Sequence, residues 1–362
     1  MGHHGVWGSL WGNMVAGALI AAVSVTTGAS PARAADEDLA KFYGGLQMKM
    51  IIRAGPAGSY DTFGRMLARH IVRHIPGNPT MVPVNMPGAS GIKAANYVAE
   101  VAPKDGSILT NVSLGFPMYQ ALGQLGAVKT DMRDFNWLGT FNATNQVMAL
   151  WHTAPVKSLE DAKKTEVLVG AATPESTGAQ LPRAYNIILG TKIKVITGYG
   201  DIAAVRLAME RGEVGGVGSD GYSDLKSDFV EMMDKKQLNI VIQVGMQKEK
   251  ELPNVPLLID QAKNDDDRAV LKFLTEANAS IGKPFATSPG VPPERVAMLR
   301  KAFDATMKDK DFLEDADKLH VAIDPIDGPA LAKIVNDIVT TPKPIIDRVK
   351  TTLGVVEGST IQ

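Results

Sequence analysis

The stretch at residues 49–75, KMIIRAGPAGSYDTFGRMLARHIVRHI, predicts a strand, a tight turn and a helix in immediate succession. The apolar run at 50–52 is typical of a buried strand. The turn that follows contains two glycines and a proline, which leave no room for a regular element. Apolar residues then recur at helical spacing, and Ser59 or Asp61 can cap the helix. This part of the chain is therefore constrained to an α/β structure.

A strand, a turn of small residues and a helix together form a site suited to anions. The backbone N–H groups of the first helical turn point outward, and that end of the helix carries about half a positive charge. A carboxylate or phosphate fits such a place. The alternative is a plain connection that binds nothing, because short strand-to-helix connections are common.

The composition limits the classes of function. The chain has 362 residues, which suits two domains, and its 45% hydrophobic and 21% charged residues are typical of a soluble globular protein. It has 38 basic and 39 acidic residues, so no basic excess exists to bind nucleic acid or an anionic membrane surface. We expect any anion to be held locally, by backbone groups and a few side chains.

Cysteine is absent, which excludes disulfides, thiolate catalysis and cysteine-ligated metal centres. Of the six histidines, His70 and His74 alone have the spacing of metal ligands on a helix, and no glutamate follows His70 as the HExxH pattern requires. We interpret that pair as part of a partly exposed helix face. The sequence predicts no metal and no cofactor.

The N-terminus resembles a secretory signal. An apolar run at 14–25 precedes small residues and the Ala32-Arg33-Ala34 motif, in the order of an apolar segment and a cleavage site. The run is shorter than the roughly 20 residues of a membrane span. No Lys or Arg precedes it, which departs from the usual pattern. We expect a signal peptide at 1–34, cleavage near Ala34 and a periplasmic location.

Two further units like the first follow later in the chain. The strand at 166–170 leads into small polar residues and a helix, and the strand at 192–197 leads into Gly198-Tyr199-Gly200-Asp201, where Asp201 can cap a helix. The glycine-rich segment 214–220 suggests close approach of its backbone to another group. A helix-rich tail begins near Ala286. Several strands thus end in small or polar residues, as the wall of a ligand cleft at the carboxyl ends of strands requires.

The motifs AGSYDTFGR (Ala57–Arg65), NMPGASG (Asn85–Gly91) and DGS (Asp105–Ser107), with PNVPLL (Pro253–Leu258) and the helix start SPGVPPERV, resemble one family. It is the Bug/TctC family of periplasmic solute-binding proteins, which serve tripartite tricarboxylate transporters. The match spans roughly residues 48–353 in the right order. Three departures stand out: Ala57 and Ser90 replace glycines, and the second-domain motif survives only as TPESTGAQL. The glycine replacements are tolerable where those positions do not need positive φ.

The resemblance implies an α/β, two-lobed periplasmic-binding-protein fold of the type II Venus-flytrap kind, with two hinge strands. Domain I would comprise residues 46–146 and 285–362, and domain II residues 147–284. The chain would pass outward near Asn145–Leu150 and return near Ala277–Ala286. Family members hold a carboxylate through backbone amides and bridging waters, without catalysis. The expected partners are a small organic acid and, transiently, membrane transporter subunits, with a monomeric receptor and no nucleic acid.

We predict ligand contacts from both domains. Asp61 is expected as a cap or loop brace, although it could meet a ligand ammonium, and Arg183 is expected as a solvated helix arginine rather than a second charge for the ligand. Tyr199 suits the core and the ligand site equally. The predicted ligand-binding residues are Gly58, Ser59, Tyr60, Asp61, Ser90, Gly91, Ser113, Thr173, Ser176, Thr177, Gly178, Tyr199 and Asp220.

Two classes of function remain. The first is a binding receptor that closes on an organic acid and delivers it to a transporter or a sensor. The second is an exported hydrolase or transferase with Ser59, Ser90 or Ser176 as nucleophile. A serine nucleophile needs a base within hydrogen-bond reach. No G-x-S-x-G elbow occurs, and the histidines lie far along the chain from these serines, so the sequence favours the receptor.

Overall fold

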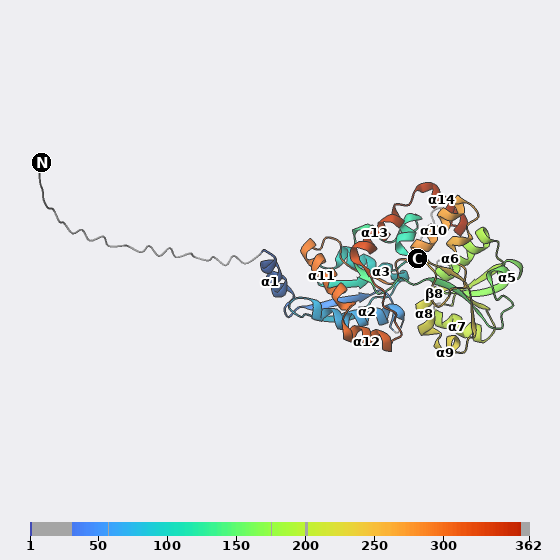
Figure 1. Cartoon of the computed structure of the whole chain (residues 1–362), viewed down its shortest axis with the longest axis horizontal. Coiled ribbons are helices and arrows are strands. Elements are labelled where there is room, and N and C mark those ends of the chain that lie inside the picture. The colour runs from blue at the N-terminus through green and yellow to red at the C-terminus, as the bar shows by residue number, and fades with distance from the viewer. Residues whose placement is uncertain (2–30, 57, 175, 200–201, 356–362) are drawn as a thin grey trace.

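The computed structural model describes residues 1, 31–56, 58–174, 176–199 and 202–355. Residues 2–30, which make up most of the predicted signal peptide, lie outside this description, as do Ala57 and the predicted helix cap Asp201. The described residues form two lobes, each built around one sheet (Figure 1).

The sheet of the first lobe has the strand order β11-β4-β10-β3-β1-β2. The pairs of β1 with β2 and with β3 are parallel, whereas β10 pairs antiparallel with both β3 and β4, and β11 pairs antiparallel with β4. The strands are β1 (Gln47–Ile52), β2 (Thr80–Asn85), β3 (Ile108–Asn111), β4 (Asn136–Thr140), β10 (Pro284–Thr287) and β11 (Ile326–Asp327).

The sheet of the second lobe has the strand order β7-β6-β8-β5-β9. Its pairs β6·β7 and β6·β8 are parallel, and β5 runs antiparallel to β8 and β9. The strands are β5 (Gln146–Trp151), β6 (Val167–Ala171), β7 (Ile193–Thr197), β8 (Gly216–Gly221) and β9 (Leu238–Val244).

Helices cover both faces of each sheet (Figure 1). Those of the first lobe and the tail are α1 (Pro31–Tyr43), α2 (Ser59–His70), α3 (Ile92–Asn96), α4 (Phe116–Ala121), α11 (Pro293–Thr306), α12 (Lys310–Lys318), α13 (Gly328–Val339) and α14 (Lys343–Leu353). Those of the second lobe are α5 (Leu159–Lys164), α6 (Thr177–Ala184), α7 (Ile202–Glu210), α8 (Tyr222–Asp228), α9 (Val230–Asp234) and α10 (Asp265–Ala279). The short helical turns are η1 (Ile71–His74), η2 (Ala89–Gly91), η3 (Tyr97–Val101), η4 (Met132–Asp134), η5 (Tyr185–Leu189) and η6 (Ile259–Gln261).

Strand β1 shows why the first sheet is buried on both faces. Met48, Met50 and Ile52 pack on one face with side chains of α2, α11 and α12, whereas Ile51 packs on the opposite face with α3, α4 and α13. Successive side chains of a strand point to opposite faces, so an unbroken apolar run is required where helices cover both. Each fully buried aliphatic side chain of this kind stabilises the fold by about 1.5–3 kcal/mol.

One apolar cluster continues from the first lobe into the second. It includes Ile51 of β1, Leu331 of α13, Val349 of α14, Leu271 of α10 and Val169 of β6. The tail helix α14 lies against α10 and α6, so the last part of the chain packs on the second lobe after α11–α13 have packed on the first. In Figure 1, α13, α14 and α10 form a continuous layer along one side of both lobes.

The chain crosses between the lobes twice before this tail. It leaves the first sheet after Thr140 and enters the second at Gln146, immediately before the predicted outward segment. It returns between Ala279 and Pro284, inside the predicted return segment. The two-lobed α/β architecture predicted from the sequence is confirmed. The outward crossing follows β4 and the return crossing precedes β10, and these two strands are paired in the first sheet.

Several local predictions can be checked. Ser158 caps α5 by accepting a hydrogen bond from the Asp161 N–H, and Asp327 caps α13 by accepting one from the Ala330 N–H. The cap expected at α2 is wrong, because Gly58 occupies the N-cap position and no side chain caps that end. Helix α12 was not predicted from the sequence. Asp309 caps it by accepting hydrogen bonds from the N–H groups of Asp311 and Phe312.

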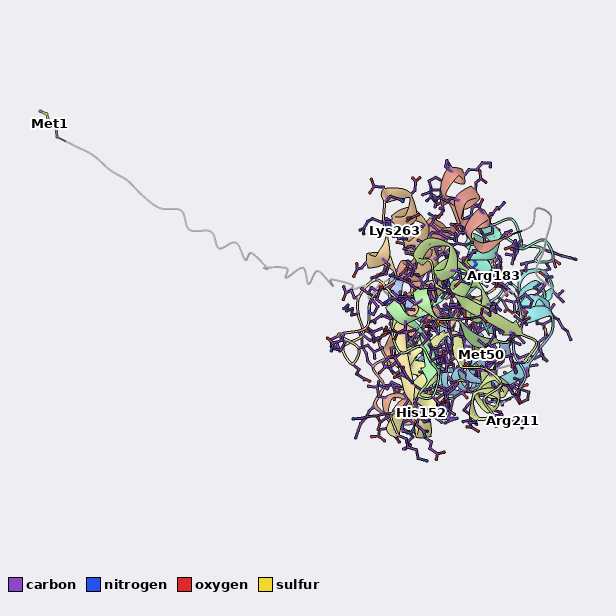
Figure 2. All side chains as sticks on the ribbon, turned by 90° about the vertical axis from the view of Figure 1, so that its right-hand side faces the viewer. Met1, Met50, His152, Arg183, Arg211 and Lys263 are labelled. Atoms are coloured by element: carbon purple, nitrogen blue, oxygen red, sulfur yellow. The ribbon has the colours of Figure 1, made fainter. Side chains whose placement is uncertain are left out.

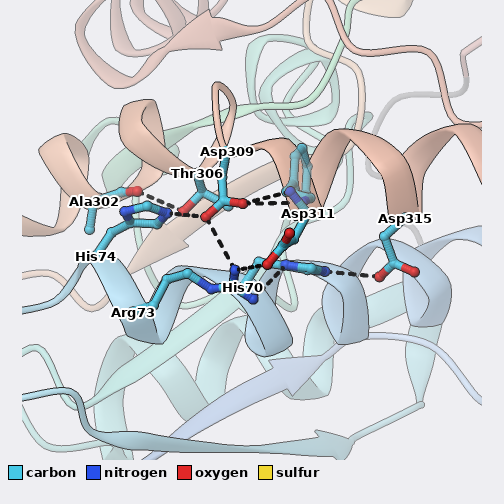
Figure 3. Close-up of polar contacts among 9 residues, drawn as sticks. His70, Arg73, His74, Ala302, Thr306, Asp309, Asp311 and Asp315 are labelled. Atoms are coloured by element: carbon cyan, nitrogen blue, oxygen red, sulfur yellow. Dashed lines mark hydrogen bonds and ion pairs between the residues drawn. The ribbon is translucent and has the colours of Figure 1, made fainter.

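Helix α12 packs on α2 and η1 through a polar cluster (Figure 3). His70 Nε2 lies 2.9 Å from Asp315 Oδ2, and His74 Nε2 lies 2.7 Å from Asp309 Oδ2. The interpretation as a partly exposed helix face is wrong for His70, which is buried, but it holds for His74, whose side chain is 24% exposed. Both histidines contact carboxylates of α12 or of its capping residue. Among the described residues, no group of three metal-ligating side chains occurs.

The arginines on the outer face of α2 and η1 complete the same cluster. Arg69 Nη1 donates to Asp315 Oδ2 at 2.5 Å, and Arg73 Nη1 donates to Asp311 Oδ2 at 2.5 Å. The hydrogen bond from His70 holds the pKa of the Asp315 carboxyl below its usual range, against the opposing effect of burial and with help from Arg69. Arg69 and Arg73 therefore both contribute to the contact of α2 and η1 with α12.

We expect Asp315→Asn to lower the free energy of unfolding at pH 7 by about 1–2 kcal/mol, because it removes a hydrogen-bonded carboxylate. The pKa of Asp315 is lowered on folding, so its contribution is present above the unfolded value of about 4 and is lost as the pH falls through the folded value. Urea unfolding from pH 7 to pH 3 should show the variant and the wild type converging in acid. Asp317→Asn, at an exposed position of the same helix, is the control. A constant difference at every pH would contradict the assignment.

Candidate functional site

The carboxyl ends of β1, β2 and β3 meet at the edge of the first sheet that faces the second lobe. In open α/β sheets this edge is where ligands bind. Arg53 follows β1 directly, and its backbone N–H donates to Asn111 Oδ1 at the end of β3 (3.0 Å). Asn111 Nδ2 in turn donates to the carbonyl oxygen of Tyr60 (2.8 Å). These bonds tie the start of α2 to two strand ends.

Tyr60 lies in the first turn of α2, next to Gly58 and Ser59. Its hydroxyl oxygen accepts a hydrogen bond from the Leu114 N–H at 3.3 Å, directly after Ser113. The guanidinium carbon of Arg53 lies 4.3 Å from the centre of the Tyr60 ring, a distance typical of a cation–π contact. These bonds place Tyr60, in the first turn of α2, beside the segment that follows β3.

Asp61 braces the loop rather than capping the helix. Its side chain is buried, and its carboxylate accepts hydrogen bonds from Arg65 Nε (2.9 Å) and Asn85 Nδ2 (2.8 Å). The same Asn85 amide also donates to the carbonyl oxygen of Ala54. Asp61 therefore ties α2 to the end of β2, which is the brace that the sequence analysis considered.

The loop after β2 approaches Arg53 closely. Arg53 Nη2 donates to the carbonyl oxygen of Ser90 at 2.5 Å. Gly91 has φ +98°, and a Cβ atom there would lie 2.4 Å from Arg53 Nε. Ser90 itself has φ +51°, so the residue that replaces a glycine of the family motif does sit in the left-handed region, at a cost of about 1 kcal/mol. Ser90 and Gly91 thus hold Arg53 in place from one side.

The predicted residues of the second lobe divide into two groups. Thr173, Ser176 and Thr177 lie at the start of α6, where Ser176 Oγ donates to the carbonyl oxygen of Thr173 at 2.7 Å. Gly178 instead faces the sheet, because a Cβ atom there would touch Ala171 and Ser219 at 3.4 Å. The glycine-rich strand β8 approaches α6 closely, which explains its glycines. A Cβ atom at Gly218 would lie 2.1 Å from the Gly178 carbonyl oxygen of α6.

Tyr199 follows β7, and Asp220 lies near the end of β8, with β6 between these two strands in the sheet. Tyr199 is partly buried against the apolar cluster of α7 and β8, and its ring lies over Gly170. This contact favours the core interpretation of Tyr199. Asp220 Oδ1 accepts a hydrogen bond from the Gly221 N–H at 3.0 Å, at the end of β8. Arg183 is exposed on α6 (Figure 2), as expected for a solvated helix arginine.

Lys283 joins the two lobes, and the sequence analysis missed it. This buried residue lies on the return crossing, and its ammonium is 5.9 Å from the centre of the Tyr60 ring and 4.9 Å from that of Phe63. On the other side, it donates to both carboxylate oxygens of Asp224 on α8, at 2.6 and 2.7 Å. Residues of α2 and α8 therefore meet at one lysine.

The charges around Lys283 explain why it stays protonated. Burial acts to lower the pKa of Lys283, but the Asp224 carboxylate, together with Tyr60 and Asp220, raises it above its ordinary value. Sequence spacing holds no sign of this arrangement, because Lys283 lies far along the chain from its partners. Arg53 was also missed, although a charged residue directly after a buried strand could have indicated it.

Two described cavities lie on the other side of the outward crossing. They have volumes of about 530 and 380 Å³ and share four lining residues, Ala143, Glu249, Glu251 and Asp324. Neither is lined by a predicted ligand-binding residue. They lie on the side of β9 and β11, whereas Tyr60, Ser90 and Asp220 lie on the side of β1 and β8.

The serines proposed as nucleophiles in the enzyme hypothesis have no histidine partner among the described hydrogen bonds. Ser176 Oγ donates to a backbone carbonyl, and the histidines nearest in sequence to Ser59, His70 and His74, contact aspartates of α12 (Figure 3). A serine nucleophile requires a base within hydrogen-bond reach. The described geometry therefore does not support serine catalysis at these positions.

No protein-family model matches the chain, and no curated protein matches it either. Solved structures do. A TctC solute-binding protein from Polaromonas, without ligand, has a TM-score of 0.62 at 19% identity, over 83% of this chain and 98% of its own. A Rhodopseudomonas palustris protein with adipate has 0.61 at 17%, over 85% and 97%. MatC from the same species, with bound malate, has 0.60 at 17%, over 85% and 99%.

At these low identities, the TM-scores and the coverage show that the fold is shared. The resemblance to the Bug/TctC family inferred from the sequence motifs is thus confirmed at the level of the fold, along nearly the whole length of those proteins. None of the described helices is both long and apolar enough to cross a membrane.

We expect Gly91→Ala to lower the free energy of unfolding by about 1–3 kcal/mol, because the new Cβ atom meets Arg53 Nε at a strained backbone position. Gly55→Ala, in a neighbouring loop where nothing lies within 4 Å of the added Cβ, should be neutral or slightly stabilising. Chemical unfolding of both variants measures the difference. Equal stabilities would show that Arg53 does not lie across Gly91.

Proposed function

We propose that the protein is an extracytoplasmic receptor that binds a small organic carboxylate between its two lobes and performs no chemistry on it. The observation that carries the proposal is the position of Arg53, held by Tyr60 and Ser90 where β1 and β2 end. A guanidinium with planar N–H groups matches a carboxylate. The first turn of α2, which no side chain caps, adds outward backbone N–H groups to the same place.

The domain boundaries belong to the same proposal. Domain I would comprise residues 46–146 and 285–362, domain II residues 147–284, and the signal peptide residues 1–34. The division of the strands between the two sheets supports these limits. The contact of α14 with α6 and α10 adds that the tail of domain I rests on domain II.

Ligand contacts are proposed from both lobes. From the first lobe they would come from Gly58, Ser59, Tyr60, Ser90, Gly91 and Ser113, to which the structure adds Arg53. From the second lobe they would come from Thr173, Ser176, Thr177 and Asp220. Closure of the lobes would then enclose the ligand. The described contacts leave Asp61, Gly178 and Tyr199 with structural roles.

The receptor would deliver its ligand to a tripartite tricarboxylate-type transporter, or to a sensor, from the periplasm. Support comes from solved structures of the same fold, which include a TctC solute-binding protein and proteins with bound adipate and malate. We propose that the receptor acts as a monomer and contacts the membrane subunits transiently.

A thermal-shift panel on the mature protein tests the proposal. We expect at least one aliphatic carboxylate, among monoacids, diacids, triacids and amino acids, to stabilise the fold by about 2.7 kcal/mol at a hundred times its dissociation constant. The matched control is the neutral amide of each acid, which should have no effect. Flat responses to every acid, with hydrolysis of model esters or amides instead, would favour the hydrolase.

A further inference from the structure

The apolar clusters on the two sides of Lys283 belong to different lobes. Phe63 lies in a cluster with residues of β1, α2, α11 and α12, and its ring stacks on that of Phe141 with 5.2 Å between the ring centres. Tyr222 and Leu225 of α8 lie in another cluster, with residues of β5, α7, β8 and α9. The two clusters share no residue, so their apolar packing does not join α2 to α8.

Lys283 belongs to the first lobe. It directly precedes β10, which pairs with β3 and β4. Its ammonium lies 4.9 Å from the centre of the Phe63 ring, within the range of a cation–π contact. The preceding Gly282 has φ +63°, and a Cβ atom there would lie 1.9 Å from the carbonyl oxygen of Asn142. The return crossing therefore packs directly on the outward crossing next to Lys283.

Asp224 belongs to the second lobe. It lies in the first turn of α8, which directly follows β8. The Tyr222 N–H donates to the carbonyl oxygen of Asn145 at 2.8 Å. The Ser223 N–H donates to Thr144 Oγ1 at 3.1 Å. These two hydrogen bonds tie the start of α8 to the outward crossing.

The ion pair of Lys283 and Asp224 joins these two positions. The ammonium lies 2.6 and 2.7 Å from the carboxylate oxygens, and the side chains of Lys283 and Asp224 are only 9% and 17% exposed. The outward crossing, the start of α8, the ion pair and the return crossing thus form a closed ring of contacts. A rotation of one lobe against the other about the crossings has to deform this ring.

We propose that the Lys283–Asp224 ion pair is a latch, which holds the two lobes in the arrangement described here, and that loss of either charge lets the lobes separate. Removal of one partner leaves the other charge buried and unpaired, and separation of the lobes brings that charge back to water. An ion pair suits such a device because both charges regain hydration when it opens, whereas an apolar contact does not. The latch acts without a ligand, so its test is independent of the proposed function.

Double electron–electron resonance between two spin labels, one on each lobe, tests the latch. The chain has no cysteine, so Lys310→Cys on α12 and Asp234→Cys on α9, both at exposed positions, create two unique labelling sites. Helix α12 packs on α2, and α9 packs on α8. We expect Lys283→Met, and likewise Asp224→Asn, to lengthen the mean distance between the labels by more than about 2 Å, because either change breaks the latch.

The matched control is Lys226→Met. It removes an exposed ion pair between the same helix, α8, and Glu251, within the second lobe, and should leave the distance between the labels unchanged. Distances that stay at the wild-type value in both latch variants would overturn the inference. An equal lengthening in the control would overturn it as well.

Circular dichroism and chemical unfolding check that each variant folds. If a single latch variant does not fold, Lys283→Gln combined with Asp224→Asn leaves two neutral side chains and no unpaired charge. We expect the same lengthening in this double variant, because the attraction between the two charges is lost. A wild-type distance in the folded double variant would contradict the latch.

Discussion

The contact of Lys283 with Asp224 on one side and with Tyr60 and Phe63 on the other is the interaction on which the proposed site depends. A buried ammonium is tolerated only when it is paired, so the lysine fixes the distance between α8 of the second lobe and α2 of the first. Because Lys283 lies on a crossing segment, a single side chain links both lobes and the connection between them.

Two kinds of packing hold the lobes together, and they differ in what they permit. Along α10, α13 and α14 the contact is apolar and continuous with the cores of both sheets. Such close-packed surfaces adopt few alternative arrangements. On the side of Tyr60 the lobes meet through the buried ion pair of Lys283 and Asp224, so the contact there depends on paired charges rather than on apolar packing.

Sequence reasoning could group the first-lobe residues of the proposed site because they follow consecutive strands. The carboxyl ends of the parallel strands β1, β2 and β3 lie at one edge of the sheet, which is where Ser59, Ser90 and Ser113 follow them. Sequence reasoning failed where one side chain can form either a local or a tertiary hydrogen bond. Asp61 has the position and chemistry of a helix cap, but Arg65 and Asn85 donate hydrogen bonds to its carboxylate instead. The histidine pair looked exposed because α12, which covers it, was not predicted.

The sequence by itself determined the class of fold and the order of the units, because hydrophobic periodicity and turn residues act over short distances along the chain. Its composition, which lacks cysteine, excluded cysteine chemistry. Only the tertiary structure decided which charges are free. Among the described residues, the Arg53 guanidinium contacts a carbonyl oxygen and an aromatic ring, whereas the Lys283 ammonium contacts a carboxylate. The pairing of Lys283 with Asp224 depends on how two lobes meet, and that arrangement is a property of the packed chain rather than of any segment.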